Sequence, residues 1–490
     1  MRLGVSLGAI HDSAERHPAP NCHPDTRTAV RQIILDWIHD ESSASSFFWL
    51  YGPAGAGKTA ILQAIAEFLC SPSGSGQNFG GSFFFSREKN GRDHGRFFFS
   101  TIAYQLALKV FGLRPHVNRI MELDPTLHTK SMDVQLRTLI VDAFQSLSPL
   151  PQRSYLVIID GLDEYHDKAT QQLILRLLCE AITVHKLPLR FLIGSRPESQ
   201  IRDSFDQESL YEVTQRVVLD EKFNPGRDIR VFLQDGFAKI SAKNSILSHV
   251  EQPWPEEGII DLLVQRSSGQ FIYAATVLKF VGADFCSPTK QLALVLKPDP
   301  MAFSDLDQLY TQILSVYPST VNIVQVLGII IASCHYHPEV IEDILEMEEG
   351  ELKLVLRGLS SLMKDEDNED NEDDEDEDDE DEDDEDDDDE DDDDEDVDDE
   401  DDDDEDEDNE DNEDKEDNED KECFMEDEDD EGGECLIKGS YVPDFAHASF
   451  PDYLFNSSRS GPFHVNRQEY ENQLTIRCFA LIMQSIRSWG

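Results

Sequence analysis

The stretch from Phe47 to Leu69 constrains the fold more than any other part of the chain. It begins with an apolar, aromatic run, Phe47–Tyr51, of the kind that forms a buried strand. The pattern G-x-x-x-x-G-K-[ST] follows, formed by Gly52, Pro53, Ala54, Gly55, Ala56, Gly57, Lys58 and Thr59. From Ala60 to Leu69, apolar residues recur at helical spacing. A strand, a glycine-rich loop and a helix in this order predict a phosphate-binding P-loop.

The chemistry expected of this loop follows from its residue types. Glycine adopts backbone conformations closed to other residues, which lets the chain approach phosphates closely. The loop N–H groups and the start of the helix, near Ala60, supply partial positive charge. Lys58 is expected to reach the β- and γ-phosphates, and the Thr59 hydroxyl to ligate Mg²⁺. The alternative is a glycine-rich turn with a chance lysine, and the flanking strand and helix argue against it.

A second apolar run ends in a group of acidic residues. Ser154–Ile159 is continuous and rich in β-branched residues, as expected of a strand buried on both faces of a parallel sheet. Asp160 follows directly and is expected to hold Mg²⁺ through the metal's water shell. Either Asp163 or Glu164 is expected to orient or deprotonate an attacking water. The alternative is a strand that ends in a solvated acidic turn.

An arginine follows a further predicted strand, Leu189–Gly194. From the end of that strand, the guanidinium of Arg196 is placed to sense a γ-phosphate through charge-assisted hydrogen bonds. The alternative is an arginine paired with a local carboxylate, such as Glu198 or Asp203.

The other apolar runs complete an α/β pattern. Further strands are expected over 81–86 and 217–219, and helices over 30–38, 98–111 and 171–185. This alternation predicts an α/β fold of the P-loop NTPase type, with an open, mostly parallel sheet and nucleotide at the carboxyl ends of its strands.

The chain after Asp228 is predicted to be wholly helical. Helices are expected over 229–240, 259–266, 271–280, 306–316 and 470–486. Three shorter helices, over 321–333, 339–345 and 351–363, suit a winged-helix unit. The last two of these carry no basic face, so a packing role is expected rather than DNA binding.

These patterns divide the chain into segments. They are a flexible leader (1–20), a P-loop NTPase core (21–225), a helical subdomain (226–318), a winged-helix-like subdomain (319–364), a disordered Asp/Glu-rich insert (365–434) and a continuation of the helical region (435–490).

The acidic insert carries most of the net charge of −62. Between Asp365 and Glu431 the chain has 56 acidic residues and two lysines, so the remainder carries only −8. Such a tract is not expected to fold alone, because like charges repel and almost no apolar residues are present. One hypothesis is an expanded low-complexity repeat in a tolerated loop. The other is electrostatic binding of basic partners such as histones.

The cysteines and the apolar runs indicate an intracellular protein. The eight cysteines form no C-x-x-C pair and no paired Cys/His spacing, which favours reduced thiols. Cys22 and His23 are adjacent but lack further ligands, which indicates turn residues rather than a metal site. Met1–Ile10 is too short for a signal peptide, and no run is apolar enough to span a membrane. We expect no membrane partner and a cytoplasmic location, with the nucleus left open.

Eight motifs carry a resemblance to a known family. They are CHPDTR (22–27), WLYGPAGAGKTAI (49–61), SFFFSR (82–87), TIAYQLA (101–107), LVIIDGLDE (156–164), FLIGSRPE (191–198), GQFIYAATVLKFV (269–281) and HASFPDYL (447–454). Together they resemble the NACHT division of the STAND P-loop NTPases, and within it the fungal-type group whose domain is called nephrocystin 3-like N-terminal. Segment 21–225 would then be the NACHT core.

The resemblance implies a switch that is closed with ADP at rest and opens with ATP to self-assemble when a ligand is sensed. Carried over, Lys58 and Thr59 hold phosphates and Mg²⁺, Asp160 is the Walker B acid, Asp163 and Glu164 are the downstream acids, and Arg196 is the sensor. His447 resembles the winged-helix histidine that touches the β-phosphate of ADP in related switches. The alternative is a buried core histidine.

The chain departs from the family pattern in two ways. Such proteins usually carry an effector domain and a repeat array, whereas here about 20 residues precede CHPDTR and no repeat period is visible. Either a minimal switch that works through partners or a truncated family remnant is expected. The acidic insert also falls before His447, which puts the placement of that residue in question.

These observations predict an ATP/ADP-binding signalling switch with at most slow hydrolysis, acting on a protein effector and self-assembling with ATP. A kinase or motor-type ATPase would need an acceptor site or a ring-forming arginine finger, and the sequence has no motif for either. The second alternative is a non-catalytic interaction protein whose acidic tract binds basic partners. No nucleic-acid partner is expected.

Overall fold

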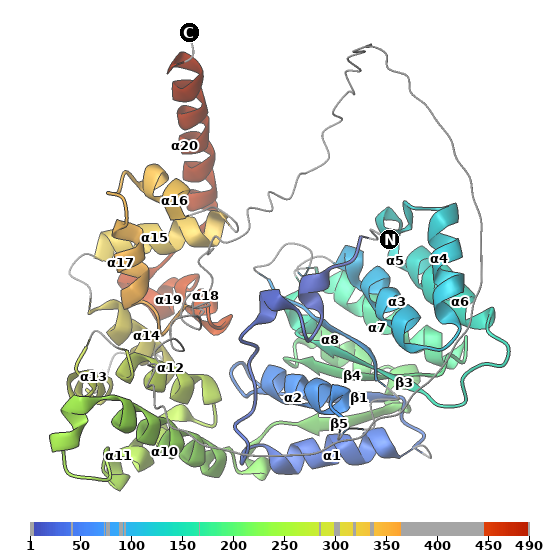
Figure 1. The fold of residues 1–490 in the computed structure, drawn as a ribbon, viewed down its shortest axis with the longest axis horizontal. Coiled ribbons are helices and arrows are strands. Elements are labelled where there is room, and N and C mark those ends of the chain that lie inside the picture. The colour runs from blue at the N-terminus through green and yellow to red at the C-terminus, as the bar shows by residue number, and fades with distance from the viewer. Residues whose placement is uncertain are drawn as a thin grey trace, which may run out of the picture. The chain divides into compact units, whose positions relative to one another are not determined.

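A computed structural model describes residues 4–40, 43–72, 74, 79–87, 92, 95–165, 167–283, 286–297, 304–316, 320–333, 338–363 and 445–488 (Figure 1). The acidic insert predicted over 365–434 lies outside the described residues.

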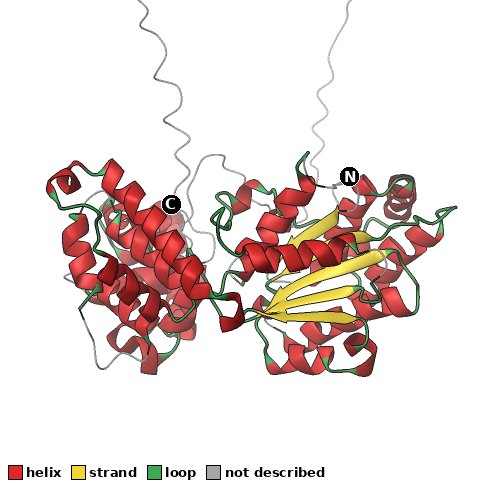
Figure 2. Cartoon of the chain, turned by 90° about the horizontal axis from the view of Figure 1, so that it is seen from below, coloured by secondary structure: helices red, strands yellow, loops and turns green. Residues whose placement is uncertain are grey.

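A five-stranded parallel sheet forms the centre of the N-terminal part (Figure 2). Its strands are β1 (Phe47–Tyr51), β2 (Phe79–Phe84), β3 (Tyr155–Asp160), β4 (Leu189–Ser195) and β5 (Thr214–Val218). They lie side by side in the order β2-β3-β4-β1-β5, and each neighbouring pair is parallel. All the predicted strands are present. β5 begins earlier than predicted. Its first residues are polar and only partly buried on an edge strand, so the sequence has no apolar run there to indicate them.

Helices cover both faces of this sheet, which explains why its central strands are continuous apolar runs. Side chains alternate between the faces, so Phe48 and Leu50 point to one helical layer while Phe47 and Trp49 point to the other. The first layer consists of α1 (Thr28–His39) and α2 (Lys58–Cys70). The second consists of α3 (Phe98–Lys109), α4 (Leu113–Leu123), α5 (Met132–Gln135), α6 (Asp142–Gln145), α7 (Lys168–Thr183), α8 (Ser199–Phe205) and α9 (Glu208–Tyr211), with a π-helical segment, Leu136–Val141, between α5 and α6.

The N-terminal segment packs on the core, whereas the sequence predicts a flexible leader over 1–20. Ala9 is fully buried. The guanidinium of Arg16 lies 3.6 Å from the centroid of the Phe84 ring and donates to Gln63 Oε1 at 2.8 Å. Single side chains make these contacts, so the segment has no periodic apolar pattern from which they could be predicted. The two short 3-10 turns of the segment are Leu7–Ala9 and Ala14–Arg16.

The described residues beyond β5 form helices with a hydrophobic core of their own. These helices are α10 (Pro225–Lys243), α11 (Glu257–Ser267), α12 (Phe271–Val281), α13 (Pro288–Val295), α14 (Asp305–Leu314), α15 (Thr320–Ser333), α16 (Pro338–Leu345), α17 (Glu351–Gly358), α18 (Ser449–Leu454), α19 (Ser457–Ser460) and α20 (Arg467–Ser488). The predicted helices are all present, although α17 ends before Met363, and α13, α18 and α19 are not among the predictions. α15, α16 and α17 occupy the segment predicted to be winged-helix-like.

The residues that flank 364–444 lie side by side. Met363 and Phe445 form an antiparallel bridge, and the Ala446 N–H donates to the Leu362 carbonyl at 2.9 Å. Phe445 and Phe450 share one core with the helices that precede residue 364. The segment that carries His447 therefore belongs to the same helical region as α14 to α17.

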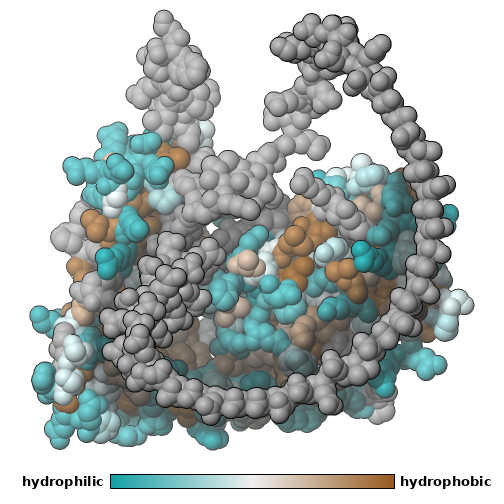
Figure 3. All heavy atoms as spheres, in the orientation of Figure 1, coloured by the Kyte–Doolittle hydropathy of each residue, from teal (hydrophilic) through white to brown (hydrophobic). Residues whose placement is uncertain are grey.

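The surface drawn in Figure 3 intersperses hydrophilic side chains with hydrophobic ones. The most exposed large apolar side chains among the described residues are those of Phe111 and Leu123. In the described part of the chain, no helix combines the length and apolar character needed to cross a bilayer.

Candidate functional site

The carboxyl ends of the strands meet a cavity of about 490 Å³. Its wall includes Ala54, Gly55, Gly57, Lys58, Thr59, Ala60, Asp160, Asp163, Glu164, Arg196 and His447. These are nearly all the site residues predicted from the sequence; Gly52, Pro53 and Ala56 belong to the same loop behind this wall. The fold thus brings together residues from the loop after β1, from the ends of β3 and β4, and from the C-terminal part of the chain.

Two glycines give the loop its course. Gly55 has φ +70° and Gly57 has φ +88°, in the left-handed region that favours glycine. A Cβ on Gly55 would lie 2.3 Å from Cγ2 of Ile272, at the start of α12, whereas a Cβ on Gly57 would meet nothing within 4 Å. The backbone at Gly57 therefore borders open space, as a close approach to phosphate requires.

Lys58 begins α2 and turns back over its own loop. Its Nζ donates to the carbonyls of Gly52 at 3.0 Å and Pro53 at 2.8 Å. An ammonium group has three N–H donors, so one remains for a ligand. Burial lowers the pKa of Lys58, while the carboxylates of Asp163 and Asp160 act in the opposite direction.

Thr59 and Asp160 form a hydroxyl–carboxylate pair. The Thr59 hydroxyl hydrogen-bonds the Asp160 side chain, which is 4% exposed. Burial raises the pKa of Asp160, and the Thr59 hydrogen bond and Lys58 oppose that rise. A Cβ on Gly194 would lie 2.6 Å from Asp160 Oδ1, so only glycine leaves room for this carboxyl. Hydroxyl and carboxylate oxygens are ligands that Mg²⁺ prefers, and this donor set fits the ion.

The two downstream acids differ in their surroundings. Asp163 is buried, and both its oxygens face Arg196: the Arg196 backbone N–H donates to Oδ1 at 2.8 Å, and Nε lies 3.2 Å from Oδ2. Glu164 lies on the cavity wall, where burial, with Asp163 and Asp160 adding, raises its pKa to about 7. A carboxyl with a pKa near neutrality has the protonation behaviour of a general base, so Glu164 fits that role better than Asp163.

Arg196 has a second carboxylate partner that the sequence analysis missed. Its Nη1 lies 2.8 Å from Oδ2 of Asp452, on α18, and Nη1 of Arg87 lies 3.1 Å from the other oxygen. The local pairing with Glu198 or Asp203, which the sequence left open, is not the one formed. Asp452 and Arg87 both lie within motifs of the resemblance, HASFPDYL and SFFFSR, but no spacing rule pairs residues so far apart.

His447 reaches the cavity from the segment that follows the acidic tract. Its Nδ1 accepts the Ser449 backbone N–H at 3.0 Å and lies 2.7 Å from Ser449 Oγ. In the neutral ring the proton must then lie on Nε2. Burial lowers the pKa of His447 to about 4, and the charges of Arg196 and Lys58 act in the same direction. The residue is half-buried and lies on the cavity wall.

Further cations line the cavity that sequence reasoning did not assign: Arg16, Arg27, Arg87, Arg92 and Lys279. Arg27 is 4% exposed, donates to the Ala56 carbonyl at 2.8 Å and lies 4.7 Å from the centroid of the Phe271 ring. Within the described residues its Nε and Nη1 have no hydrogen-bond partner. Burial lowers the pKa of Arg16 to about 10, with the charge of Arg92 adding. Cations outnumber acids on this wall, as a polyanionic ligand would require.

Comparison with known proteins gives one family match. Residues 29–196, from α1 to Arg196, match the family model described as "Nephrocystin 3, N-terminal", which covers about a third of the chain. No curated protein matches the chain significantly. One similar solved structure is titled "Crystal structure of DNA replication initiation factor", at 12% identity and a TM-score of 0.25, over 70% of this chain and 97% of that chain. A score this low establishes neither the fold nor the function of this chain.

Proposed function

We propose that this chain is a NACHT-type nucleotide switch, which binds ATP and ADP with Mg²⁺ and hydrolyses ATP slowly at most. One observation carries the proposal: His447, from the end of the chain, shares a cavity wall with Lys58 and Asp160. A ligand in that cavity would touch the α/β core and the helical region together. The phosphates of the ligand would therefore influence how firmly the helical region is held against the α/β core.

The polar residues of the wall match the parts of a nucleotide. Loop N–H groups and the free donor of Lys58 would hold the β- and γ-phosphates. Thr59 and Asp160 would hold Mg²⁺, which when bound neutralises charge on the phosphate oxygens. Arg27 and Phe271 offer a cation and an apolar ring for the remainder of the ligand.

His447 would report which nucleotide is bound. Its neutral ring presents Nε2–H, a donor suited to a phosphate oxygen, while Nδ1 is held by Ser449. A diphosphate in contact with this donor would keep the C-terminal segment against the core. Switching requires only that the closed and open forms bind the nucleotides with different affinities.

Hydrolysis would be slow while the protein is closed, because the arginine near the γ-phosphate position is then already engaged. Arg196 is bound by Asp163 and Asp452, so little of its charge is free for a transition state. Glu164 would accept the proton of the attacking water. Self-assembly with ATP and an effector protein belong to the same proposal.

The nucleotide content of the purified protein tests the proposal. The protein is purified without EDTA and denatured, and the released nucleotide is identified by chromatography. We expect near-stoichiometric ADP in the wild type and none in Lys58→Ala. Lys222→Ala, which removes a lysine 85% exposed, is the matched control and should retain ADP. An empty wild-type protein that also fails to bind added Mg²⁺–ATP would overturn the proposal.

A further inference from the structure

Asp452 joins α18 to two arginines of the cavity wall. Its Oδ2 lies 2.8 Å from Nη1 of Arg196, and its Oδ1 lies 3.1 Å from Nη1 of Arg87. The three side chains are between 22% and 29% exposed, so each is mostly but not wholly removed from water. The carboxylate is the shared anionic partner of both guanidinium groups.

The two arginines converge on the acidic turn after β3. Arg196 contacts the carboxylate of Asp163, and Nη2 of Arg87 donates to the Asp163 carbonyl at 3.2 Å. Glu164, the candidate for activating water, is the next residue. A terminal phosphate near Glu164 would therefore lie close to both guanidinium groups.

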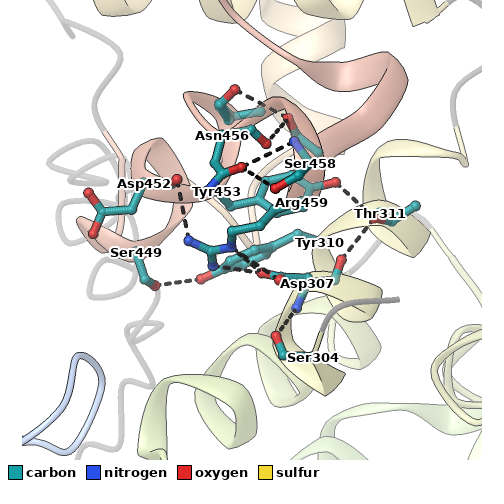
Figure 4. Close-up of polar contacts among 12 residues, drawn as sticks. Ser304, Asp307, Tyr310, Thr311, Ser449, Asp452, Tyr453, Asn456, Ser458 and Arg459 are labelled. Carbon is teal, nitrogen blue, oxygen red and sulfur yellow. Dashed lines mark hydrogen bonds and ion pairs between the residues drawn. The ribbon is translucent and has the colours of Figure 1, made fainter. Parts of the chain in front are cut away.

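On its other side, α18 is tied to α14 by buried contacts (Figure 4). Arg459, just beyond α18, lies 2.7 Å from Oδ1 and 3.1 Å from Oδ2 of Asp307, which is 1% exposed. The Tyr310 hydroxyl lies 2.8 Å from Ser449 Oγ. The Asp452 carbonyl faces Arg459 at 3.4 Å, while its carboxylate points away from this cluster. The helical region thus anchors α18 to α14, while the Asp452 carboxylate faces Arg196 and Arg87.

We propose that the Asp452 carboxylate competes with the terminal phosphate of a nucleoside triphosphate for Arg196 and Arg87, and so gives the closed protein its preference for a diphosphate. The inference rests on the proposed nucleotide switch and names the residue that sets its preference. Carboxylate and phosphate oxygens are equivalent partners for a guanidinium fork, and both cannot occupy the same donors. A diphosphate leaves the Asp452 pairs intact, whereas a triphosphate must displace them.

The competition also links the ligand to the fold. Because α18 is tied to α14, displacing the carboxylate moves α18 away from the arginines or leaves Asp452 without partners. This coupling is reciprocal. If a bound triphosphate weakens the hold of the arginines on α18 by some factor, detaching α18 strengthens triphosphate binding by that same factor. The carboxylate therefore couples triphosphate binding to the release of the C-terminal segment.

The test compares two nucleotides on three proteins. Dissociation constants for ADP and for ATPγS, each with Mg²⁺, are measured by calorimetry on the wild type, Asp452→Asn and Asp452→Glu. In Asp452→Asn, the ratio of the ATPγS constant to the ADP constant should fall by about 5- to 150-fold, the usual range of such coupling. Asp452→Glu keeps the charge and should restore most of the wild-type ratio.

Asp261→Asn is the matched control, since it removes a carboxylate 58% exposed that pairs with Arg230 on the surface. Its ratio should equal that of the wild type. An unchanged ratio in Asp452→Asn, when both nucleotides bind, would overturn the inference and leave the switch proposal standing. A wild type that binds neither nucleotide would overturn both. Thermal melts confirm that each variant is folded before titration.

Discussion

The backbone N–H of Arg196 donates to Oδ1 of Asp163 at 2.8 Å, and the Nε of the same arginine lies 3.2 Å from Oδ2. This two-point contact sets the direction of the guanidinium at the end of β4. It also occupies both oxygens of Asp163, so in the proposed function that carboxylate orients the arginine and Glu164 is the residue that would activate water.

Removal of Asp163 should destabilise the fold. Asp163→Ala leaves Arg196 partly buried with Asp452 as its remaining carboxylate, and removing one partner of a buried pair costs about 3–5 kcal/mol of unfolding free energy. Urea denaturation measures the change. Asp206→Ala is the control, because Asp206 is 51% exposed and its pair with Arg216 should contribute less than about 1 kcal/mol. Equal losses in both variants would contradict the assignment.

Glu164 should make the fold less stable as the pH rises from about 4.5 to about 7. Its pKa is raised from 4.5 to about 7, so the unfolded chain loses this proton first and the unfolding free energy falls between those values. Glu164→Gln removes that loss and should gain about 1–3 kcal/mol at pH 8 and almost nothing at pH 4. Denaturation at both pH values checks this, with the exposed Glu251→Gln as control. A gain that is equal at the two pH values would count against it.

His447 should produce the opposite slope. Its pKa is lowered from 6.5 to about 4, so the unfolded chain takes up a proton that the folded protein refuses, and stability is lost as the pH falls from 6.5 to 4. His447→Gln should reduce this acid loss by no more than about 3 kcal/mol, less because the ring is partly exposed. Titrating the C2–H proton resonance of His447 gives the pKa directly, with the exposed His249 as reference. A value near 6.5 would refute the prediction.

The two loop glycines should respond differently to alanine. Both variants suffer left-handed backbone strain of about 1–2 kcal/mol, but only Gly55→Ala also collides with Ile272. Gly55→Ala should therefore be the less stable of the two. The double variant Gly55→Ala/Ile272→Ala relieves the collision, so the effects of its two substitutions should not add. Additive losses would show that the contact does not limit the loop.

Local sequence patterns correctly predicted the strands, most of the helices and the glycine-rich loop. The run 47–51 and the loop after it are contiguous in sequence, so their geometry follows from nearest neighbours. The position of Asp160 was also predictable, because a carboxylate after a buried strand must lie at the sheet edge. α4 is not among the predicted helices, although Leu113, Val117 and Met121 recur at intervals of four, a spacing typical of the buried face of a helix.

The contacts between distant segments were beyond sequence reasoning. The Asp452 pairs join α18 to arginines several hundred residues earlier, and Arg16 reaches the cavity from a segment without periodicity. Such contacts depend on how the elements pack, which no residue spacing encodes. The sequence therefore predicted the residues of the P-loop side of the cavity wall and left open which other residues surround them.

The bridge between Met363 and Phe445 has a consequence for how this chain can change over time. Met363 and Phe445 hold the two borders of the 364–444 segment in direct backbone contact, whatever the number of residues between them. Insertions and deletions within that segment can therefore accumulate without shifting either border. A lineage could lengthen or shorten its acidic run freely while His447 kept its position beside the glycine-rich loop 52–59.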